Sequence, residues 1–377
     1  MKYYNLKLNK RAVILFVVIL SLFTSIGGLW LIREKDTYVT KAPPQLPIPS
    51  LKSLAKDKGL QVGSFASLKY LRERAYTDIL ASQFEYAIVD GEPNWKFEDH
   101  ELRPSIDTYN FEDIDQVFAF AEQNDMPVRV QHLVWGDDKW LPDWLKNGDF
   151  TQPELMQILK DHITTVTTRY KGRVREYSVV NEAFSRKLLT GGNHDWWGEH
   201  LDQTYIDNAF IWARQGDPNA VLILNDFGNE TEGDTSNLMY NYIKEAKGRG
   251  VPIDAIGMQM HIDATNAPSR DKVVANMKRF NDIGVKVYIT EFDVNMHGLE
   301  KDRHEEDQVQ ATIYSDLLSA CLDVGSTNCP NFGFLGLIDR QSWYNGLGIT
   351  DANPLLFNDD YTPKPAFYAV RDILTSK

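Results

Sequence analysis

The chain has 377 residues, of which 43% are hydrophobic and 25% are charged, a composition typical of a globular protein rather than a disordered one. Its formal net charge of −13 at pH 7 argues against a nucleic-acid partner, because binding to phosphates favours a basic face. The length allows one large domain or two domains of ordinary size.

The N-terminus departs from the globular pattern. An uncharged apolar run over residues 12–32 is long enough to span a bilayer. A cleaved signal peptide is the alternative, but its apolar core is usually shorter. Four basic residues precede the run: Lys2, Lys7, Lys10 and Arg11. We therefore predict a cytoplasmic tail at 1–11, a membrane anchor at 12–32 and an extracytoplasmic remainder, secreted if the anchor is cleaved.

Residues 33–50 contain Pro43, Pro44, Pro47 and Pro49. A segment so rich in proline is typical of a semi-rigid spacer. We expect the spacer to end at residue 50 and the folded domain to occupy residues 51–377.

Within this domain, short runs of β-branched and aromatic residues indicate strands. They lie at 61–65, 86–89, 128–135, 176–180, 221–225, 255–260, 286–290 and 332–338. Longer stretches between them have the apolar spacing of helices, as at 111–125 and 154–170. Strands that alternate with helices predict parallel pairing and right-handed crossovers.

Eight such units predict an α/β fold, the (β/α)8 TIM barrel. The runner-up is a doubly wound sheet. That fold is expected to carry a G-x-G-x-x-G turn after its first strand, and VGSFASLKY at 62–70 lacks it.

Polar residues cluster where the predicted strands end, which is where such barrels carry their chemistry. Glu182 ends the fourth strand and Glu291 ends the seventh, so the two carboxyl groups should face each other across the barrel mouth. A retaining glycosidase places two carboxyl groups about 5–5.5 Å apart, and an inverting one roughly 6.5–9.5 Å. A structural ion-pair network and a metal-dependent lyase or isomerase are the alternatives. The spacing of the carboxylates favours neither a metal nor a cofactor.

The two segments around these residues are also recognisable. YSVVNEAF (177–184) and VYITEFDV (287–294) resemble the active-site signatures of glycoside hydrolase family 10, whose members are mostly endo-β-1,4-xylanases. Further stretches from about Leu51 to the C-terminus resemble the family in the same order. The resemblance implies a retaining endo-β-glycosidase that hydrolyses xylan or a related β-linked polysaccharide. We expect a monomer that needs no cofactor.

The resemblance assigns roles to the catalytic residues. Glu182 would be the acid/base and Glu291 the nucleophile. His261, held by Asp293, would support the nucleophile, and Gln259 is expected in the same hydrogen-bond shell.

The resemblance also predicts substrate contacts. Asn181 would hold the sugar 2-hydroxyl, and Glu92 and Lys96 would bind on the glycone side. Trp135 and Trp343 would offer aromatic faces to the sugar.

Two cysteines, Cys321 and Cys329, are the only ones in the chain. Their separation allows either a short disulfide loop or two buried thiols. The resemblance favours the disulfide.

Several family positions differ around the attacked sugar. Gln131 and Gly136 stand where the family has histidines, Pro93 where it has asparagine, and Leu335 where it has tryptophan. Phe97 and Phe227 replace a tryptophan and a tyrosine. His132 lies one position away from the first histidine, so it should point to the opposite face, unless a local bulge restores its orientation.

These departures predict a changed substrate or subsite preference. Two alternatives stay open. One is a cell-surface glycan-binding protein with weak or no catalysis, and the other is a β-glucanase or β-1,3-xylanase of the same fold.

Overall fold

The structure is a computed structural model that describes residues 44–91, 93–96, 100–188 and 195–376. The predicted tail at 1–11 and the predicted anchor at 12–32 lie outside the described residues, as does Glu92. Among the residues that are described, no helix is both long and apolar enough to cross a membrane.

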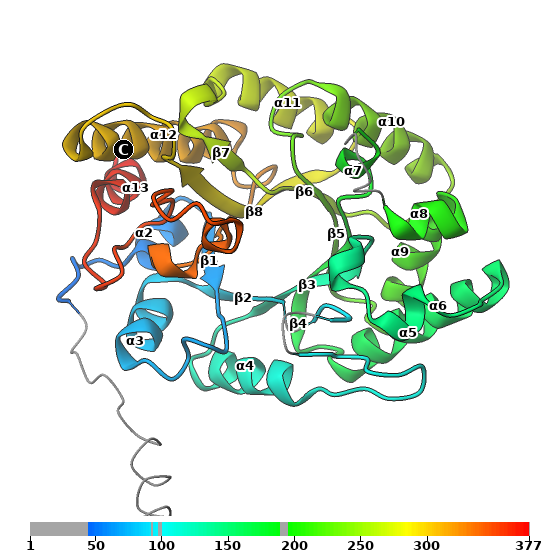
Figure 1. The fold of residues 1–377 in the computed structure, drawn as a ribbon. Coiled ribbons are helices and arrows are strands. Elements are labelled where there is room, and N and C mark those ends of the chain that lie inside the picture. Colours follow the sequence, from blue (N-terminus) through cyan, green and yellow to red (C-terminus); the bar gives the residue numbers. More distant parts are fainter. Residues whose placement is uncertain (1–43, 92, 97–99, 189–194, 377) are drawn as a thin grey trace, which may run out of the picture. The chain divides into compact units, whose positions relative to one another are not determined.

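The described residues form a closed (β/α)8 barrel of parallel strands (Figure 1). Neighbouring strands pair in chain order from β1 to β6, then β6 pairs with β8, β8 with β9, and β9 with β1. The short strand β7 pairs with the second half of β8. The strands are β1 Gln61–Phe65, β2 Tyr86–Asp90, β3 Val128–Trp135, β4 Val174–Asn181, β5 Val221–Asp226, β6 Ala255–Met258, β7 His261–Asp263, β8 Lys286–Asn295 and β9 Asn331–Phe334.

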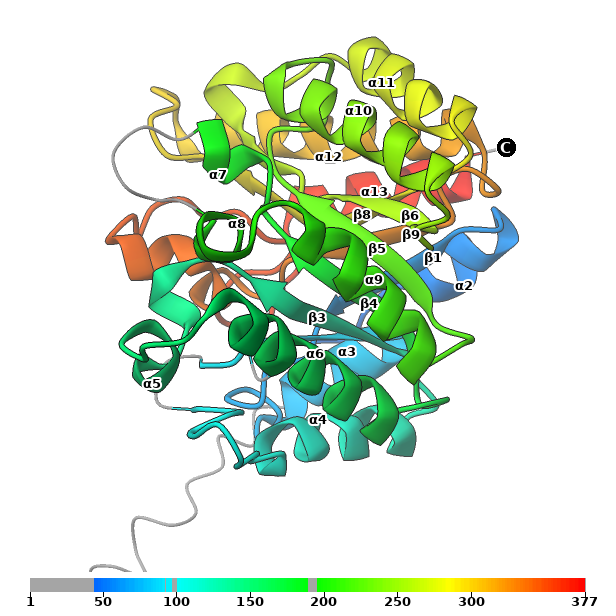
Figure 2. The same ribbon diagram turned by 90° about the vertical axis from the view of Figure 1, so that its right-hand side faces the viewer.

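Helices surround the strands, and their buried faces pack against the strands in one apolar core. The longer helices are α2 Leu51–Asp57, α3 Arg74–Gln83, α4 Glu112–Gln123, α6 Gln152–Arg169, α9 Thr204–Gly216, α10 Asp234–Gly248, α11 Arg270–Asp282, α12 Arg303–Val324 and α13 Pro365–Thr375. The short ones are α5 Asp143–Lys146, α7 Ser185–Leu188 and α8 Trp196–Leu201, with 3-10 turns η1 Asp138–Trp140, η2 Ala264–Asn266, η3 Asp339–Gln341 and η4 Trp343–Leu347. Figure 2 shows α5, α7 and α8 at one end of the barrel, with α2 toward the other.

All eight predicted strands are present, but some of their ends differ from the prediction. The sixth ends at Met258, because Met260 adopts a positive φ of 62° that a strand cannot continue through. The seventh continues to Asn295, so Glu291 lies inside β8 rather than at its end. This extension pairs with β7, where His261 lies opposite Asp293.

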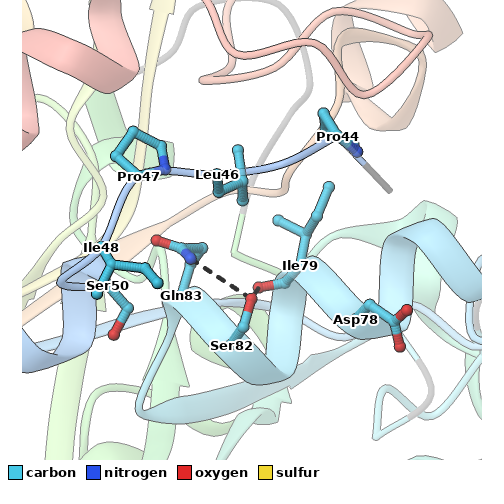
Figure 3. A pocket seen from close by; sticks show the side chains of 9 residues that line it. All are labelled: Pro44, Leu46, Pro47, Ile48, Ser50, Asp78, Ile79, Ser82 and Gln83. Atoms are coloured by element: carbon cyan, nitrogen blue, oxygen red, sulfur yellow. Dashed lines mark hydrogen bonds between the residues drawn. The ribbon is translucent and has the colours of Figure 1, made fainter. Parts of the chain in front are cut away.

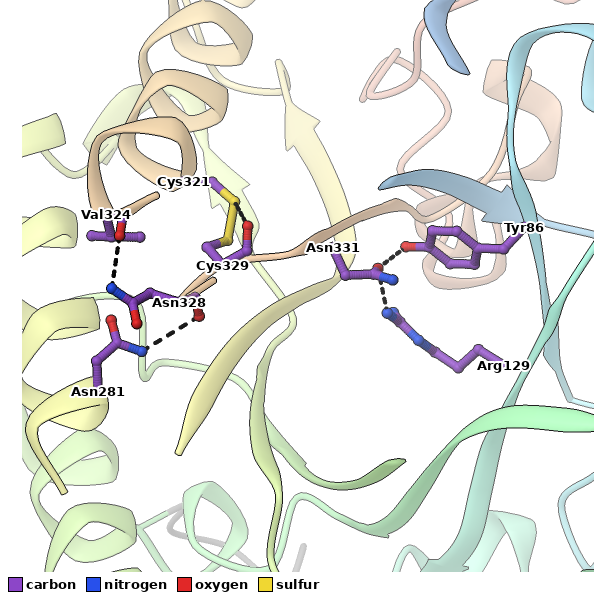
Figure 4. Close-up of a disulfide and its surroundings, with 8 residues drawn as sticks. All are labelled: Tyr86, Arg129, Asn281, Cys321, Val324, Asn328, Cys329 and Asn331. Atoms are coloured by element: carbon purple, nitrogen blue, oxygen red, sulfur yellow. Dashed lines mark hydrogen bonds between the residues drawn. A yellow bond between two sulfur atoms is a disulfide. The ribbon is translucent and has the colours of Figure 1, made fainter. Parts of the chain in front are cut away.

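A polar cluster fills the interior of the barrel, where charged side chains need partners. Arg129 of β3 donates to Glu176 of β4 at 2.7 Å and also to the side-chain oxygen of Asn331 of β9. Asn331 returns a hydrogen bond to Glu176 at 3.0 Å. The hydroxyl of Tyr86 on β2 donates to Asn331 as well, and Figure 4 shows Tyr86, Arg129 and Asn331 converging. We call these four residues the floor cluster.

A disulfide joins Cys321 to Cys329, as Figure 4 shows. It links the last turns of α12 to the segment that leads into β9. Asn328 closes the same loop by donating to the carbonyl of Val324 at 2.8 Å. The disulfide that the resemblance favoured is therefore present.

The described end of the predicted spacer lies on the barrel. Leu46 packs against the apolar core, and the guanidinium of Arg371 donates to the carbonyl of Pro49. Between this segment and α3 lies a cavity of about 460 Å³ (Figure 3). Its lining is mostly proline and aliphatic, with Ser82 and Gln83 hydrogen-bonded to each other at 3.4 Å. It contains neither member of the predicted carboxylate pair.

Candidate active site

Glu182 follows the last residue of β4 in a tight turn. Its φ of 58° is uncommon for a residue other than glycine, and its backbone N–H donates to the carbonyl of Asn225 at 2.9 Å. Asp226, at the end of β5, accepts the N–H groups of Phe184 at 2.9 Å and Ser185 at 3.3 Å. These bonds fix the turn, and Glu182 as a whole residue is 7% exposed.

Burial raises the pKa of Asp226 to about 7, and the carboxylate of Glu182 also raises it. The hydrogen-bond donors of the turn act in the opposite direction and lower it. The carboxyl that holds the turn thus titrates near neutral pH.

Three side chains donate to the Glu182 carboxylate. The indole of Trp135 reaches Oε2 at 2.9 Å, and the amide of Gln259 reaches Oε1 at 3.2 Å. Arg186, one helical turn after Glu182, approaches Oε2 with Nε at 2.8 Å and Nη2 at 2.6 Å. The carboxylate therefore has a fixed orientation in the barrel mouth.

Glu291 projects from β8 and is also 7% exposed. Its Oε1 accepts from the amides of Gln131 at 3.0 Å and Asn225 at 2.8 Å. His261 Nε2 lies 3.4 Å from Oε2, and His132 Nε2 lies 3.9 Å from Oε1. Polar groups from β3, β5, β7 and β8 thus meet at this carboxylate.

These contacts determine its charge. Burial lowers the pKa of His132 to about 4, although the Glu291 carboxylate opposes this, so the imidazole is neutral at pH 7. Burial also acts to raise the pKa of Glu291, but its polar partners outweigh burial and hold that pKa below the usual value. Because His132 is neutral, we attribute the lowered pKa to His261 and Asn225. Glu291 is ionised at neutral pH.

His261 lies between two carboxylates. Its Nδ1 is 3.1 Å from Asp293 Oδ1, and the indole of Trp343 donates to the other oxygen of Asp293 at 3.0 Å. Burial would lower the pKa of His261, but Asp293 and Glu291 together raise it well above the usual value. The imidazole is cationic and is oriented toward Glu291.

Hydrogen bonds connect the two glutamates through amides. Gln259 bridges Glu182 to Asn181 Oδ1 at 3.0 Å. Asn225 bridges that same oxygen, at 2.8 Å, to Glu291. The structure therefore joins Glu182 and Glu291 in one hydrogen-bond network. Asn181 Nδ2 is buried and has no hydrogen-bond partner among the described residues, so it is a donor available to a ligand.

The predicted orientation of His132 is wrong. The register between β3 and β4 shifts between Gln131 and Val134, and this irregularity breaks the strict alternation of faces. Gln131 and His132 therefore both lie beside Glu291. His132 Nδ1 is hydrogen-bonded to the hydroxyl of Ser178 at 2.8 Å. The amide of Gln131 supplies a donor at the position where a family histidine was expected.

The predicted partner of Gln259 is also wrong. Its amide bonds to Glu182 and Asn181 rather than to Glu291, because β6 stops at Met258 and Gln259 lies in the break before β7. Lys96 forms an ion pair with Glu101 at 3.3 Å. Trp343 leaves 44% of its surface exposed at the mouth, in keeping with a surface for a ligand.

Two of the departing positions have structural explanations. A side chain at Gly136 would begin 2.2 Å from Asp195 Oδ1, so Asp195 occupies the space that a larger residue would need. Leu335 packs against Phe65, Tyr86 and Ile88 inside the barrel.

Sequence reasoning missed Arg186, which contacts Glu182 directly, and Asp137, which reaches Glu182 only through Arg186. The i, i+4 spacing of Glu182 and Arg186 was a usable signal. It becomes meaningful only once a helical turn is known to follow the strand.

The site can move protons and supply an oxygen nucleophile. No group of three or more His, Cys, Asp or Glu side chains suited to a metal ion occurs in the part of the chain that is described.

The chain is similar to known glycosyl hydrolases. The sequence model of glycosyl hydrolase family 10 matches residues 50–373. Endo-1,4-beta-xylanase B of Thermotoga neapolitana is 32% identical over 337 residues, which cover 87% of this chain and 92% of the relative.

Among solved structures, xylanase 10B of Thermotoga petrophila in complex with xylobiose matches with a TM-score of 0.80 and 34% identity. The match covers 88% of this chain and 98% of that one. A mutant of Cellvibrio japonicus xylanase 10C in complex with xylopentaose matches with a TM-score of 0.80 and 26% identity. This match covers 86% of this chain and 69% of that one.

Proposed function

Since the chain belongs to glycosyl hydrolase family 10, we propose that it is a retaining endo-β-1,4-xylanase that cleaves xylan by double displacement. The observation that carries this proposal is the hydrogen-bond network that links Glu182 and Glu291 through Gln259, Asn181 and Asn225. Relatives solved with xylobiose and xylopentaose support xylan as the substrate class.

In the first step, Glu291 attacks the anomeric carbon of the bound sugar while Glu182 gives its proton to the glycosidic oxygen. The carbon–oxygen bond to the leaving sugar breaks, and a glycosyl–enzyme ester forms. Glu291 suits the nucleophilic role because its lowered pKa keeps it ionised. The cationic His261 orients it.

In the second step, Glu182, now ionised, takes a proton from water, and the water oxygen attacks the anomeric carbon. The ester bond to Glu291 breaks, and the sugar leaves with its original configuration. Trp135, Gln259 and Arg186 hold Glu182 in place in both steps.

Substrate contacts follow from the same site. The unpartnered Nδ2 of Asn181 is placed to donate to the 2-hydroxyl of the attacked sugar, a bond that strengthens as charge develops. The exposed ring of Trp343 offers an apolar face to a sugar ring.

We also propose that the catalytic domain works outside the cytoplasm, carried by the predicted anchor at 12–32. The disulfide between Cys321 and Cys329 supports this, because disulfides persist in oxidising compartments. The mass of the mature protein distinguishes an anchored chain from a cleaved one.

The test compares the wild type with Glu182→Ala and Glu291→Ala. We expect the wild type to release reducing sugars steadily from xylan and NMR to show the β-anomer first. Glu182→Ala should lose about 10²–10⁴-fold on xylan, since it lacks the general acid, but should still form the glycosyl–enzyme from 2,4-dinitrophenyl β-xylobioside. Glu291→Ala should be inactive on both substrates.

Binding to xylan without hydrolysis would instead identify a glycan-binding protein. Faster cleavage of aryl β-cellobioside than of the β-xylobioside would point to a β-glucanase. Appearance of the α-anomer first would contradict the retaining mechanism.

A further inference from the structure

One guanidinium is shared between two carboxylates beside the predicted acid/base. Arg186 Nη2 lies 2.6 Å from Glu182 Oε2 and 2.8 Å from Asp137 Oδ2. Asp137 is held in turn, because its other oxygen accepts the backbone N–H of Lys139 at 3.0 Å. The side chains of Arg186, Glu182 and Asp137 are 7%, 10% and 18% exposed. Charges this poorly solvated interact more strongly than charges in water.

The net charge of the trio differs between the two forms of Glu182. With Glu182 ionised, the three side chains carry a net charge of −1. With Glu182 protonated, they are neutral, because Asp137 remains paired with Arg186. Without Asp137, the arginine would favour the ionised form alone. Without Arg186, two neighbouring carboxylates would favour the protonated form.

We propose that Arg186 and Asp137 are positioning residues that set the balance between the acid and the base form of Glu182. This inference rests on the proposed function, in which Glu182 must be protonated in the first step and ionised in the second. Arg186 favours the water-activating step, and Asp137 preserves the proton-donating step.

Other charged or titratable groups surround Glu182, and the variants below leave them unchanged. Asp226 faces it from β5, Lys187 follows Arg186 on α7, and Asp195 precedes α8. Across the site are Glu291, His132 and His261.

The experiment measures the pH dependence of kcat/KM on xylotriose for the wild type, Arg186→Met, Asp137→Asn and the double variant. In Arg186→Met, the two carboxylates lose the cation between them, so the alkaline limb of kcat/KM should move up by about 1 pH unit or more. In Asp137→Asn, the uncompensated arginine should move the limb down by a similar amount. In the double variant, the limb should return close to that of the wild type.

The matched control is the exposed pair Arg270 and Asp323, which are 2.7 Å apart on α11 and α12. Arg270→Met and Asp323→Asn should leave the limb where it is. Arg186→Lys keeps the positive charge and should stay near the wild-type profile even if Arg186→Met folds poorly.

The inference would be overturned if the alkaline limb shifted in the same direction in Arg186→Met and Asp137→Asn, or in neither variant. In that case, xylotriose hydrolysis by the wild type would still support the proposed function. A wild type that hydrolyses no xylo-oligosaccharide would overturn both.

Discussion

Acidification should destabilise this protein through His132. The imidazole is 3% exposed, and burial lowers its pKa from 6.5 to about 4. As the pH falls from 6.5 toward 4, the unfolded chain therefore binds a proton that the folded chain does not. Since stability rises with pH wherever the unfolded state binds more protons, it must fall across this window. Below about pH 4 both states are protonated, and the loss is complete.

The magnitude follows from the width of the window. Each pH unit between the two pKa values is worth about 1.4 kcal/mol, so lowering the pH from 6.5 to 5.0 removes about 2 kcal/mol of unfolding free energy through this one residue. That is a substantial part of the 5–15 kcal/mol typical of a folded protein.

The assay is urea unfolding followed by tryptophan fluorescence, at pH 6.5 and at pH 5.0, for the wild type and His132→Gln. Glutamine does not titrate, so the unfolding free energy of the variant should rise by about 2 kcal/mol relative to the wild type on going to pH 5.0. Ser178→Ala removes the hydrogen-bond partner of His132 but keeps the buried imidazole, and its difference from the wild type should stay nearly constant. An unchanged difference for His132→Gln would refute the assignment of a buried neutral histidine.

Three further outcomes are expected. Lys364→Met should lower the free energy of unfolding in urea by about 3–5 kcal/mol, because it leaves the buried carboxylate of Asp339 without the ammonium that contacts both its oxygens at 2.8 and 2.9 Å. Replacing Asp339 by leucine as well should restore most of that free energy. Replacing both Cys321 and Cys329 by alanine should lower the free energy of unfolding by about 2–3 kcal/mol, because the unfolded chain is no longer constrained by the closed loop. Equal urea midpoints for this variant and the wild type would contradict the prediction. Trp135→Phe should lower kcat/KM on xylotriose about 10- to 100-fold through the lost charge-assisted hydrogen bond to Glu182, and steady-state kinetics on xylotriose measure it.

The barrel could be predicted because its signal is local. Runs such as 128–135 and 221–225 contain mostly residues that suit buried strands, and the stretches between them have helical spacing. Strand ends then placed Glu182 and Glu291 at the mouth. The parallel topology alone puts all carboxyl ends of strands on one face.

The rest of the site depends on tertiary features that the sequence pattern does not carry. His132 points toward Glu291 because the register of β3 shifts against β4, and a shift of register is a property of the pair of strands. Gln259 serves Glu182 because β6 stops early. Arg186 reaches Glu182 because a helical turn follows the strand at once. Each of these depends on the geometry of a break or a turn, whereas periodicity reports only on regular elements.

The floor cluster has a consequence for the order in which the chain folds. Arg129 and Tyr86 both depend on Asn331, which lies 202 and 245 residues further along the sequence. Contacts between such distant residues form only after a large loss of chain entropy. Until β9 arrives, the guanidinium and its glutamate are incompletely paired in an open sheet. The last strand therefore completes the interior of the first four, and the barrel should close late and cooperatively rather than assemble from two stable halves.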